Sequence, residues 1–259
     1  MCKSGDRGIL RHGYMIDELR KLPFGTCEDG GFSVNVHSPS KGSRKPAIIL
    51  TVDVEPDWGI RGVRAIREVL PRFLQLLDDL SVSATFFVVS DLIESCCDLL
   101  RQIPQRHEIG SHGASHQRFD NMPKGQVLEE LTLSRIRLEE ILSTAVRGIR
   151  APFLARPADW FSMLRRSGYS YDSSVGSVYP SAENTPAWSW KVDRQNGVWE
   201  LPPTTLWTGY VPFSLTYLRL FSPVGRSLAP RRGGVLYLHL HELASASLTD
   251  VLPRPPGYT

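Results

Sequence analysis

The feature that most constrains the fold is a repeated alternation of short apolar runs with amphipathic helical stretches. The runs at 47–54 (AIILTVDV) and 83–89 (SATFFVV) are rich in β-branched and aromatic residues, as strands covered on both faces are. The stretches at 71–80 and 127–143 carry apolar residues on one helical stripe, with Pro71 expected in a first turn. At least five such alternations predict a mainly parallel sheet, open or closed into a barrel. The shorter strand-like runs are HEIGSH, GIRAPF, YSYDSSV and GGVLYLHLH, and the other helical stretches are 92–103 and 158–169.

The chain divides at about residue 45. Residues 1–45 are punctuated by Gly, Ser and Pro, which predicts an irregular N-terminal extension with one short helix near Tyr14 to Lys21. Residues 46–259 are predicted to form a single barrel domain, because 259 residues suit one barrel or one large α/β domain. Residues 176–232 are rich in Pro and Trp and break the alternation, so a long insertion or a set of loops over one end of the barrel is expected there.

Composition argues against several classes of protein. Hydrophobic residues make up 41% and charged residues 22%, which is unlike a disordered or fibrous chain. The net charge of +3 is too small to suggest a nucleic-acid partner, and no apolar stretch approaches the roughly 20 residues of a transmembrane helix. The N-terminal residues lack the apolar core of a signal peptide, so a cytoplasmic location is expected. The four cysteines have no C-x-x-C spacing and are expected to be reduced and mostly buried.

Two carboxylates stand where a buried strand ends. Asp53 and Glu55 are two residues apart, so in a strand both side chains point to the same face. The carboxyl ends of parallel strands are where α/β sheets and barrels build their sites. Two carboxylates that close repel unless a cation lies beside them. A loop of solvated acids, with Asp57 nearby, is the alternative interpretation.

Histidines and an arginine follow other short strands. His112 and His116 form an H-x-x-x-H pair, which together with one carboxylate makes a metal site of the open, catalytic type, although paired histidines in a loop also occur by chance. Arg150 could pair with either carboxylate, or be an ordinary surface residue before a proline. His239 and His241 are predicted on one face of the last strand, as core residues or as a general acid.

Read in order, the segments TVDVEPDWG, SATFFVV, HEIGSHGASH, RAPF, YDSSV, ELPPTT and LYLHLHE resemble the polysaccharide deacetylase family, the NodB-homology domain of carbohydrate esterase family four. The resemblance covers roughly Ala47 to Glu242. It implies a distorted (β/α) barrel of about seven parallel strands in a single domain. Where the family commonly has T-F-D-D-G, this chain has T-V-D-V-E, and Val54 at the usual ligand position cannot bind metal. The chain is similar to a subset with D-V-D or D-V-E, in which the third residue, here Glu55, is the ligand.

The resemblance implies a role for each matched residue. Asp53 would be the catalytic base, Arg150 would keep it ionised, and His239 would be the general acid, with His241 as its rival. Asp172 or Glu200 would orient His239. The implied metal ligands are Glu55, His112 and His116. The residues suggested for substrate binding are Trp58, Phe153, Asp172 and His241, while Trp190 and Trp207 could stack on a sugar ring or simply fill the core.

The implied activity is that of a metal-dependent hydrolase that removes an N-acetyl or formyl group from an amino sugar or glycoconjugate. The cofactor would be one divalent ion, most simply Zn²⁺, with Co²⁺, Ni²⁺ or Mn²⁺ as alternatives. Two other functions stay open at this point: a cyclic-amide hydrolase of the allantoin type, and a non-catalytic carbohydrate-binding relative. The expected partner is a small-molecule or glycan substrate. The absence of a secretion signal favours a nucleotide-linked, lipid-linked or small soluble substrate over the cell wall.

Overall fold

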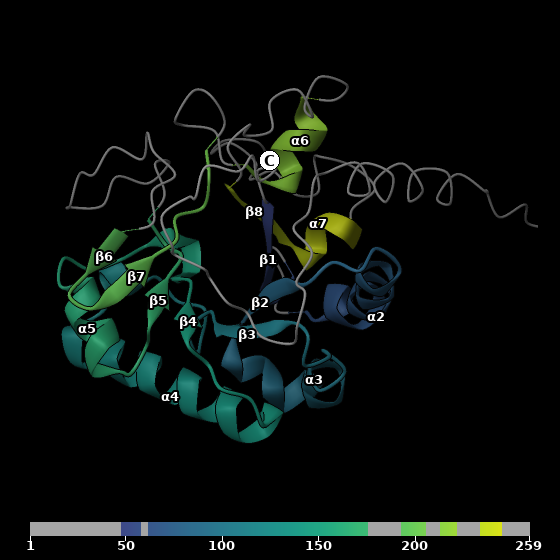
Figure 1. The fold of residues 1–259 in the computed structure, drawn as a ribbon. Coiled ribbons are helices and arrows are strands. Elements are labelled where there is room, and N and C mark those ends of the chain that lie inside the picture. Colours follow the sequence, from purple (N-terminus) through teal and green to yellow (C-terminus); the bar gives the residue numbers. More distant parts are fainter. Residues whose placement is uncertain (1–47, 58–61, 176–192, 206–212, 222–233, 245–259) are drawn as a thin grey trace, which may run out of the picture.

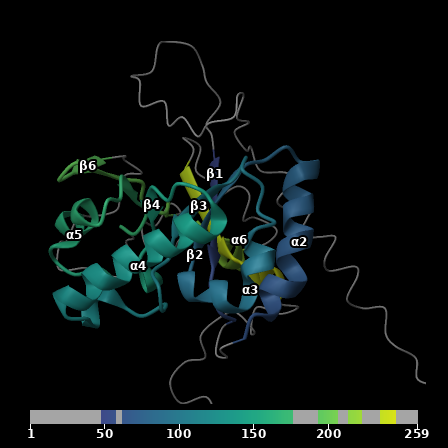
Figure 2. The same ribbon diagram turned by 90° about the horizontal axis from the view of Figure 1, so that it is seen from below.

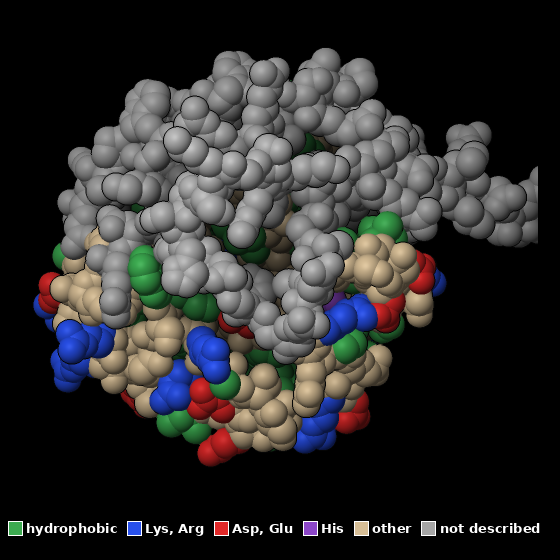
Figure 3. All heavy atoms as spheres, viewed as in Figure 1, with side chains coloured by type: hydrophobic (Ala, Val, Ile, Leu, Met, Phe, Trp, Pro, Cys, Tyr) green, Lys and Arg blue, Asp and Glu red, His purple; other side chains and the backbone are tan. Residues whose placement is uncertain are grey.

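The computed structural model describes residues 48–57, 62–175, 193–205, 213–221 and 234–244. The predicted N-terminal extension and its helix near Tyr14 to Lys21 lie outside the described residues, as do Trp58, Trp190 and Trp207. The division of the chain near residue 45 therefore stays a prediction. In the view of Figure 3, acidic and basic side chains are interspersed over the described surface.

Eight strands of the described chain form one curled sheet, in the order β6-β7-β5-β4-β3-β2-β1-β8. The seven strands from β7 to β8 run parallel, and β6 pairs antiparallel with β7. Figure 1 shows the strands curving around a central space with helices outside them. The predicted distorted barrel of seven parallel strands is confirmed. The strands are β1 Ile48–Val54, β2 Ala84–Val88, β3 Glu108–Ser111, β4 Gly148–Ile149, β5 Tyr171–Asp172, β6 Asp193–Gln195, β7 Val198–Glu200 and β8 Gly234–His239.

Strand β1 lies between β2 and β8 and forms the centre of the core. Val52 and Val54 are fully buried, as expected for an apolar run covered on both faces. The register pairs Asp53 with His239 of β8 on one side and with Phe87 of β2 on the other. The parallel register therefore sets the predicted base directly beside the predicted acid.

The helices cover the outer face of the sheet. Figure 2 shows α2, α3, α4 and α5 side by side beneath it. Helix α2 begins at Arg64 and continues through Pro71, so the expectation that Pro71 lies in a first turn is wrong. The stripe of buried side chains extends back to Ala65 and Ile66, and it holds the earlier turn against the core. The helices are α2 Arg64–Asp79, α3 Ile93–Leu100, α4 Lys124–Leu142, α5 Trp160–Arg166, α6 Leu215–Leu220 and α7 Leu240–Ala244.

Two expectations about the C-terminal half are corrected. The last strand ends at His239 and helix α7 follows at once, so His239 and His241 do not share a strand face. The segment 176–232 is also more than loops, because β7 within it pairs parallel with β5. That strand has three residues with Val198 and Glu200 buried, which is too short to leave a periodic signal in the sequence.

No helix among the described residues is long and apolar enough to cross a membrane. Cys96 and Cys97 are both free thiols on α3, and Cys96 is buried. These two cysteines agree with the expectation of reduced thiols, while Cys2 and Cys27 lie outside the described residues.

Candidate metal centre and active site

A carboxylate and two imidazoles meet beyond the carboxyl ends of β1 and β3. Glu55 follows β1 directly, His112 follows β3, and His116 lies four residues further along the same loop. Oε2 of Glu55 lies 2.7 Å from Nε2 of His116 and 3.4 Å from Nε2 of His112. One ligand atom of each residue falls within 4.8 Å of the others. The structure therefore brings together the three predicted metal ligands.

The surrounding backbone orients these rings. Nδ1 of His112 lies 2.7 Å from the carbonyl oxygen of Arg150, and a proton on Nδ1 leaves the Nε2 lone pair facing Glu55. The carboxylate of Glu130, on α4, accepts hydrogen bonds from the backbone N–H groups of Ala114 and Ser115 and so fixes the loop between the histidines. Two aimed imidazoles and one carboxylate are the donor set of an open divalent site, so these residues fit a bound metal ion.

The charge on Glu55 is favoured by its neighbours. Burial disfavours the carboxylate, but the imidazoles of His239, His112 and His116 outweigh it and hold the pKa of Glu55 well below its usual value. An ionised carboxylate is the form that binds a cation.

Asp53 forms a buried ion pair with Arg150. Nη1 of Arg150 lies 2.8 Å from Oδ1 of Asp53, and Arg150 is fully buried. The guanidinium also donates to the carbonyl oxygen and to the hydroxyl of Ser173, and it lies over the ring of Phe87. Sequence reasoning left two carboxylates open as partners of Arg150, and the structure pairs it with Asp53.

His239 lies at the centre of this edge. Its Nε2 atom is 3.8 Å from Oδ2 of Asp53 and 3.9 Å from Oε1 of Glu55, and its side chain is partly exposed. Burial lowers the pKa of its imidazole, but the nearby carboxylates, above all Glu55, outweigh burial and raise that pKa to about 10. The imidazole therefore favours its protonated form, as a general acid requires.

His241 lies beside His239. The two rings stack with centroids 4.9 Å apart, and Nδ1 of His241 is 3.8 Å from Oε1 of Glu55. Burial and the neighbouring His239 lower the pKa of His241. The turn from β8 into α7 brings this histidine inward, because an α-helix turns through about 100° per residue where a strand alternates by 180°.

The residue that faces the other nitrogen of His239 is Glu242, which sequence reasoning missed. Oε2 of Glu242 lies 3.6 Å from Nδ1 of His239. The predicted orienting residues, Asp172 and Glu200, are register partners on β5 and β7, and Asp172 is hydrogen-bonded to Ser174. One signal was present in the sequence: a Glu three residues after a helix-capping position commonly reaches back to the cap.

An open groove adjoins the metal-ligand cluster. It has a volume of about 970 Å³, and Glu55, His116, Asp57 and Phe153 are among the residues that line it. Phe153 is partly exposed, its ring lies 4.9 Å from that of His116, and its backbone has a φ of 57°. A non-glycine residue in this left-handed region is strained, which often marks a functional position.

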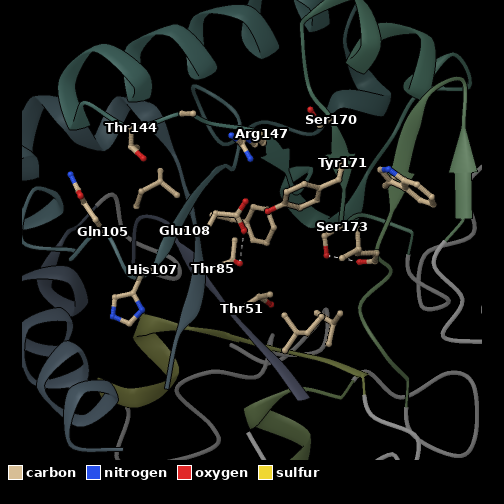
Figure 4. Close-up of a pocket in the computed structure, with 17 residues that line it drawn as sticks. Thr51, Thr85, Gln105, His107, Glu108, Thr144, Arg147, Ser170, Tyr171 and Ser173 are labelled. Carbon is tan, nitrogen blue, oxygen red and sulfur yellow. Dashed lines mark hydrogen bonds between the residues drawn. The ribbon is translucent and has the colours of Figure 1, made fainter. Parts of the chain in front are cut away.

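A second cavity, of about 410 Å³, lies at the opposite end of the strands (Figure 4). Glu108 and Tyr171 point toward each other across it, and Thr85 donates a 2.9 Å hydrogen bond to Glu108. Burial raises the pKa of Glu108. None of the three described residues that could hold a metal lines this cavity.

Comparison with known proteins shows the family of the chain. The family model for polysaccharide deacetylase matches residues 40–171, about half of the chain. The chain therefore belongs to the polysaccharide deacetylase family. A peptidoglycan deacetylase of Helicobacter pylori is 29% identical over 121 residues, which make up 46% of this chain and 41% of that protein. The match thus spans less than half of that relative.

Solved structures share the fold. A protein from Mycobacterium smegmatis described as a polysaccharide deacetylase superposes with a TM-score of 0.55 at 19% identity, over 83% of this chain and 85% of that one. A mutant of a Bacillus anthracis pseudoenzyme of carbohydrate esterase family 4, with restored enzymatic activity, gives a TM-score of 0.50 at 18% identity, over 80% and 59% of the two chains. At such identities these likenesses speak for the fold alone.

Proposed function

We propose that this protein is a metal-dependent hydrolase that removes an N-acetyl or formyl group from an amino sugar or glycoconjugate. The observation that carries the proposal is the meeting of three groups at one edge of the sheet: the Glu55, His112 and His116 cluster, the buried Asp53–Arg150 pair, and His239. The deacetylase name of the Helicobacter pylori relative supports an acetylated glycan as substrate.

Glu55, His112 and His116 would hold one divalent ion, most simply Zn²⁺, with Co²⁺, Ni²⁺ or Mn²⁺ as alternatives. When bound, such an ion acts as a Lewis acid and lowers the pKa of water. The membership of the chain in the D-V-E subset, in which Glu55 replaces the usual ligand, is part of this proposal. Val54 is fully buried and carries no ligand atom.

The remaining residues would move protons. Asp53 would take a proton from the attacking water, and Arg150 would orient its carboxylate through the 2.8 Å pair. Nε2 of His239 would then give a proton to the leaving amine, because this nitrogen faces the carboxylates of the site. Deacetylation needs a base for the water and an acid for the leaving amine, and Asp53 and His239, 3.8 Å apart, would supply them.

Substrate would lie in the groove beside His116. Phe153, exposed at its edge, would contact the sugar, and His241 would face the reacting group from the side of Glu55. Asp172 is fully buried and bonded to Ser174, so we propose a supporting role for it rather than direct contact with substrate. Trp58 stays a predicted substrate-binding residue.

The activity is tested by measuring acetate and formate release from a panel of N-acetylated and N-formylated sugars, from monomers to peptidoglycan fragments, with and without a chelator. Allantoin belongs in the panel, because it separates a cyclic-amide hydrolase from a deacetylase. We expect chelator-sensitive acetate release from at least one sugar. Turnover of allantoin alone would favour the cyclic-amide alternative. Metal-free protein that binds glycans without turnover would identify a non-catalytic relative.

A further inference from the structure

We propose that Glu242 is a positioning residue that holds the His239 ring in the orientation in which Nε2 can protonate the leaving amine. The inference rests on the proposed deacetylation, and it assigns a function to a carboxylate that does not itself touch the reacting atoms. It begins from the junction between β8 and α7, where His239 is the last strand residue and Glu242 lies in the first turn of the helix.

The Glu242 carboxylate reaches back over this junction. Its Oε2 atom accepts a 2.7 Å hydrogen bond from the backbone N–H of His239 and lies 3.6 Å from Nδ1 of the same residue. The backbone contact is one half of a capping box, in which a Glu at the third helical position satisfies the N–H of the capping residue. Backbone and ring of His239 therefore face one carboxylate oxygen.

The other oxygen of this carboxylate is held from a different element. Oε1 of Glu242 accepts hydrogen bonds from both the backbone N–H and the hydroxyl of Thr216, on α6. Glu242 is 2% exposed, so water does not compete for these donors. Three donors from two elements fix the carboxylate plane, and Oε2 stays aimed at His239.

The position of the Glu242 carboxylate gives the two ring nitrogens of His239 different surroundings. A proton on Nδ1 faces an anionic acceptor, while Nε2 faces Asp53 and Glu55 at the centre of the site. A buried carboxylate beside one imidazole nitrogen favours one orientation of the ring, and it leaves the other nitrogen for proton transfer. Loss of the Glu242 charge would then slow the step in which His239 donates its proton.

A purely structural role for Glu242, as helix cap and anchor of α6, makes a different prediction. It would lower stability and slow every substrate by the same factor. Thr216→Val is a matched control, because it removes the hydroxyl donor to the same carboxylate but leaves the charge facing His239. Comparison of Glu242→Gln with Thr216→Val therefore separates positioning of His239 from anchoring of α6.

The test measures kcat and KM of the zinc-loaded full chain on an N-acetylated sugar and on an activated aryl acetate, whose leaving group needs no proton. We expect Glu242→Gln to lower kcat on the amide by about 10–100-fold with KM little changed, and to spare the aryl ester. Thr216→Val should affect both substrates alike. In the His239→Ala background, Glu242→Gln should cost nothing further. Equal losses on both substrates, or losses that add to those of His239→Ala, would overturn the proposal.

A second measurement is independent of activity. Nitrogen-15 spectra of histidine-labelled protein report the protonation and hydrogen bonding of each ring nitrogen, and His239→Ala identifies the signals among the seven histidines. We expect the same Nδ1 signal of His239 in the wild type and in Thr216→Val, and a shifted Nδ1 signal in Glu242→Gln. If the wild type releases no acyl group but this change is seen, the proposed function fails and the positioning role stands. An unchanged His239 signal in Glu242→Gln would refute the positioning role whatever the activity.

Discussion

At the scale of single residues, the buried Asp53 and Arg150 at the carboxyl edge of the sheet are matched in charge. Arg150 is the largest charged side chain with no exposed surface, and its guanidinium divides its donors between Asp53 and Ser173. A lysine at this position would offer one compact charge in place of a planar fork and could not serve both partners in the same way. The planar guanidinium of Arg150 thus fixes the position of the Asp53 carboxylate.

Replacing Asp53 by Asn should abolish the base while keeping an acceptor for Arg150. We expect kcat/KM on an N-acetylated sugar to fall by about 10²–10⁴-fold, the usual cost of losing a general base. Metal content, measured on the purified variant, should stay stoichiometric because Asp53 is not among the three ligands. An Asp53→Asn enzyme that works at the wild-type rate would show that the reaction needs no base at this position.

His107 predicts a pH dependence of stability that is separate from catalysis. Burial, helped by Arg106, lowers its pKa from 6.5 to about 4, and its Nδ1 accepts a 3.1 Å hydrogen bond from the backbone N–H of Ala84. The folded state therefore holds the neutral ring, while the unfolded state binds a proton below pH 6.5. Stability is fully present above pH 6.5 and is lost as the pH falls toward 4. At 1.36 kcal/mol per pKa unit, the loss is on the order of 3 kcal/mol.

The measurement is urea unfolding of the wild type and of His107→Gln at several pH values between 4 and 7. Gln keeps an acceptor for Ala84 but does not titrate, so the difference between the two proteins cancels the other titrating groups. We expect the wild type to lose more stability than His107→Gln on acidification. Parallel curves for the two proteins would contradict the assignment.

At the scale of elements, two glycines in the strands make room for aromatic rings inside the sheet. Gly148 on β4 and Gly110 on β3 leave room for the rings of Tyr171 and Phe87, which meet edge to face at 6.4 Å between centroids. A Cβ atom at Gly148 would overlap the Tyr171 ring, so the ring would have to shift. Glycine at this point therefore lets the Tyr171 ring of β5 lie against β4.

Gly148→Ala and Gly125→Ala form a matched pair of substitutions. Gly148→Ala should destabilise the protein by about 1–3 kcal/mol, the usual range for overpacking. Gly125 is exposed in the first turn of α4 with open space around it, so Gly125→Ala should be neutral or stabilise by up to about 1 kcal/mol. Thermal and urea unfolding measure both. A neutral Gly148→Ala would mean that Tyr171 can move aside.

At the scale of the whole molecule, the parallel sheet brings residues from distant parts of the chain together at one edge. The groups at this edge come from the ends of β1, β3, β4 and β8, and the register of β1 with β8 alone joins positions 53 and 239. A metal ion held by Glu55, His112 and His116 would link two of these segments and would bind the folded chain only. Metal affinity and folding stability should therefore be coupled.

Zinc should raise the melting temperature of the wild type, and a chelator should reverse the change. At 100 times the dissociation constant the stabilisation is about 2.7 kcal/mol, or on the order of 5–10 °C for a chain of this size. Glu55→Ala should abolish the shift. Asp57→Ala is the control: its carboxylate caps α2 through the N–H groups of Arg64 and Ala65, so it should cost about 1 kcal/mol but keep the zinc shift. If zinc no longer raises the melting temperature of Asp57→Ala but still raises that of Glu55→Ala, then Asp57 and not Glu55 is the metal ligand.

The sequence by itself determined the class of fold and most of the chemistry. Long buried strands such as β1 and β2 are continuous runs of apolar residues. Such a run can be recognised in the sequence without knowledge of the strands beside it. Polar residues at the ends of those runs, such as Asp53 and His112, stand out because a core strand is otherwise apolar. This contrast singled out the two carboxylates, His112, His116 and Arg150, and the family resemblance then implied Glu55 as the metal ligand and Asp53 as the partner of Arg150.

Only the tertiary structure decided how the last strand ends and what faces its histidine. The two-residue spacing of His239 and His241 is compatible with a strand or with a turn into a helix, and the choice depends on Glu242 and Thr216, which lie in different elements. Strands of two or three residues, such as β4, β5 and β7, are likewise too short to carry a period. Their place in the sheet is set by pairing with neighbours far away in the chain, a property that no local stretch of sequence contains.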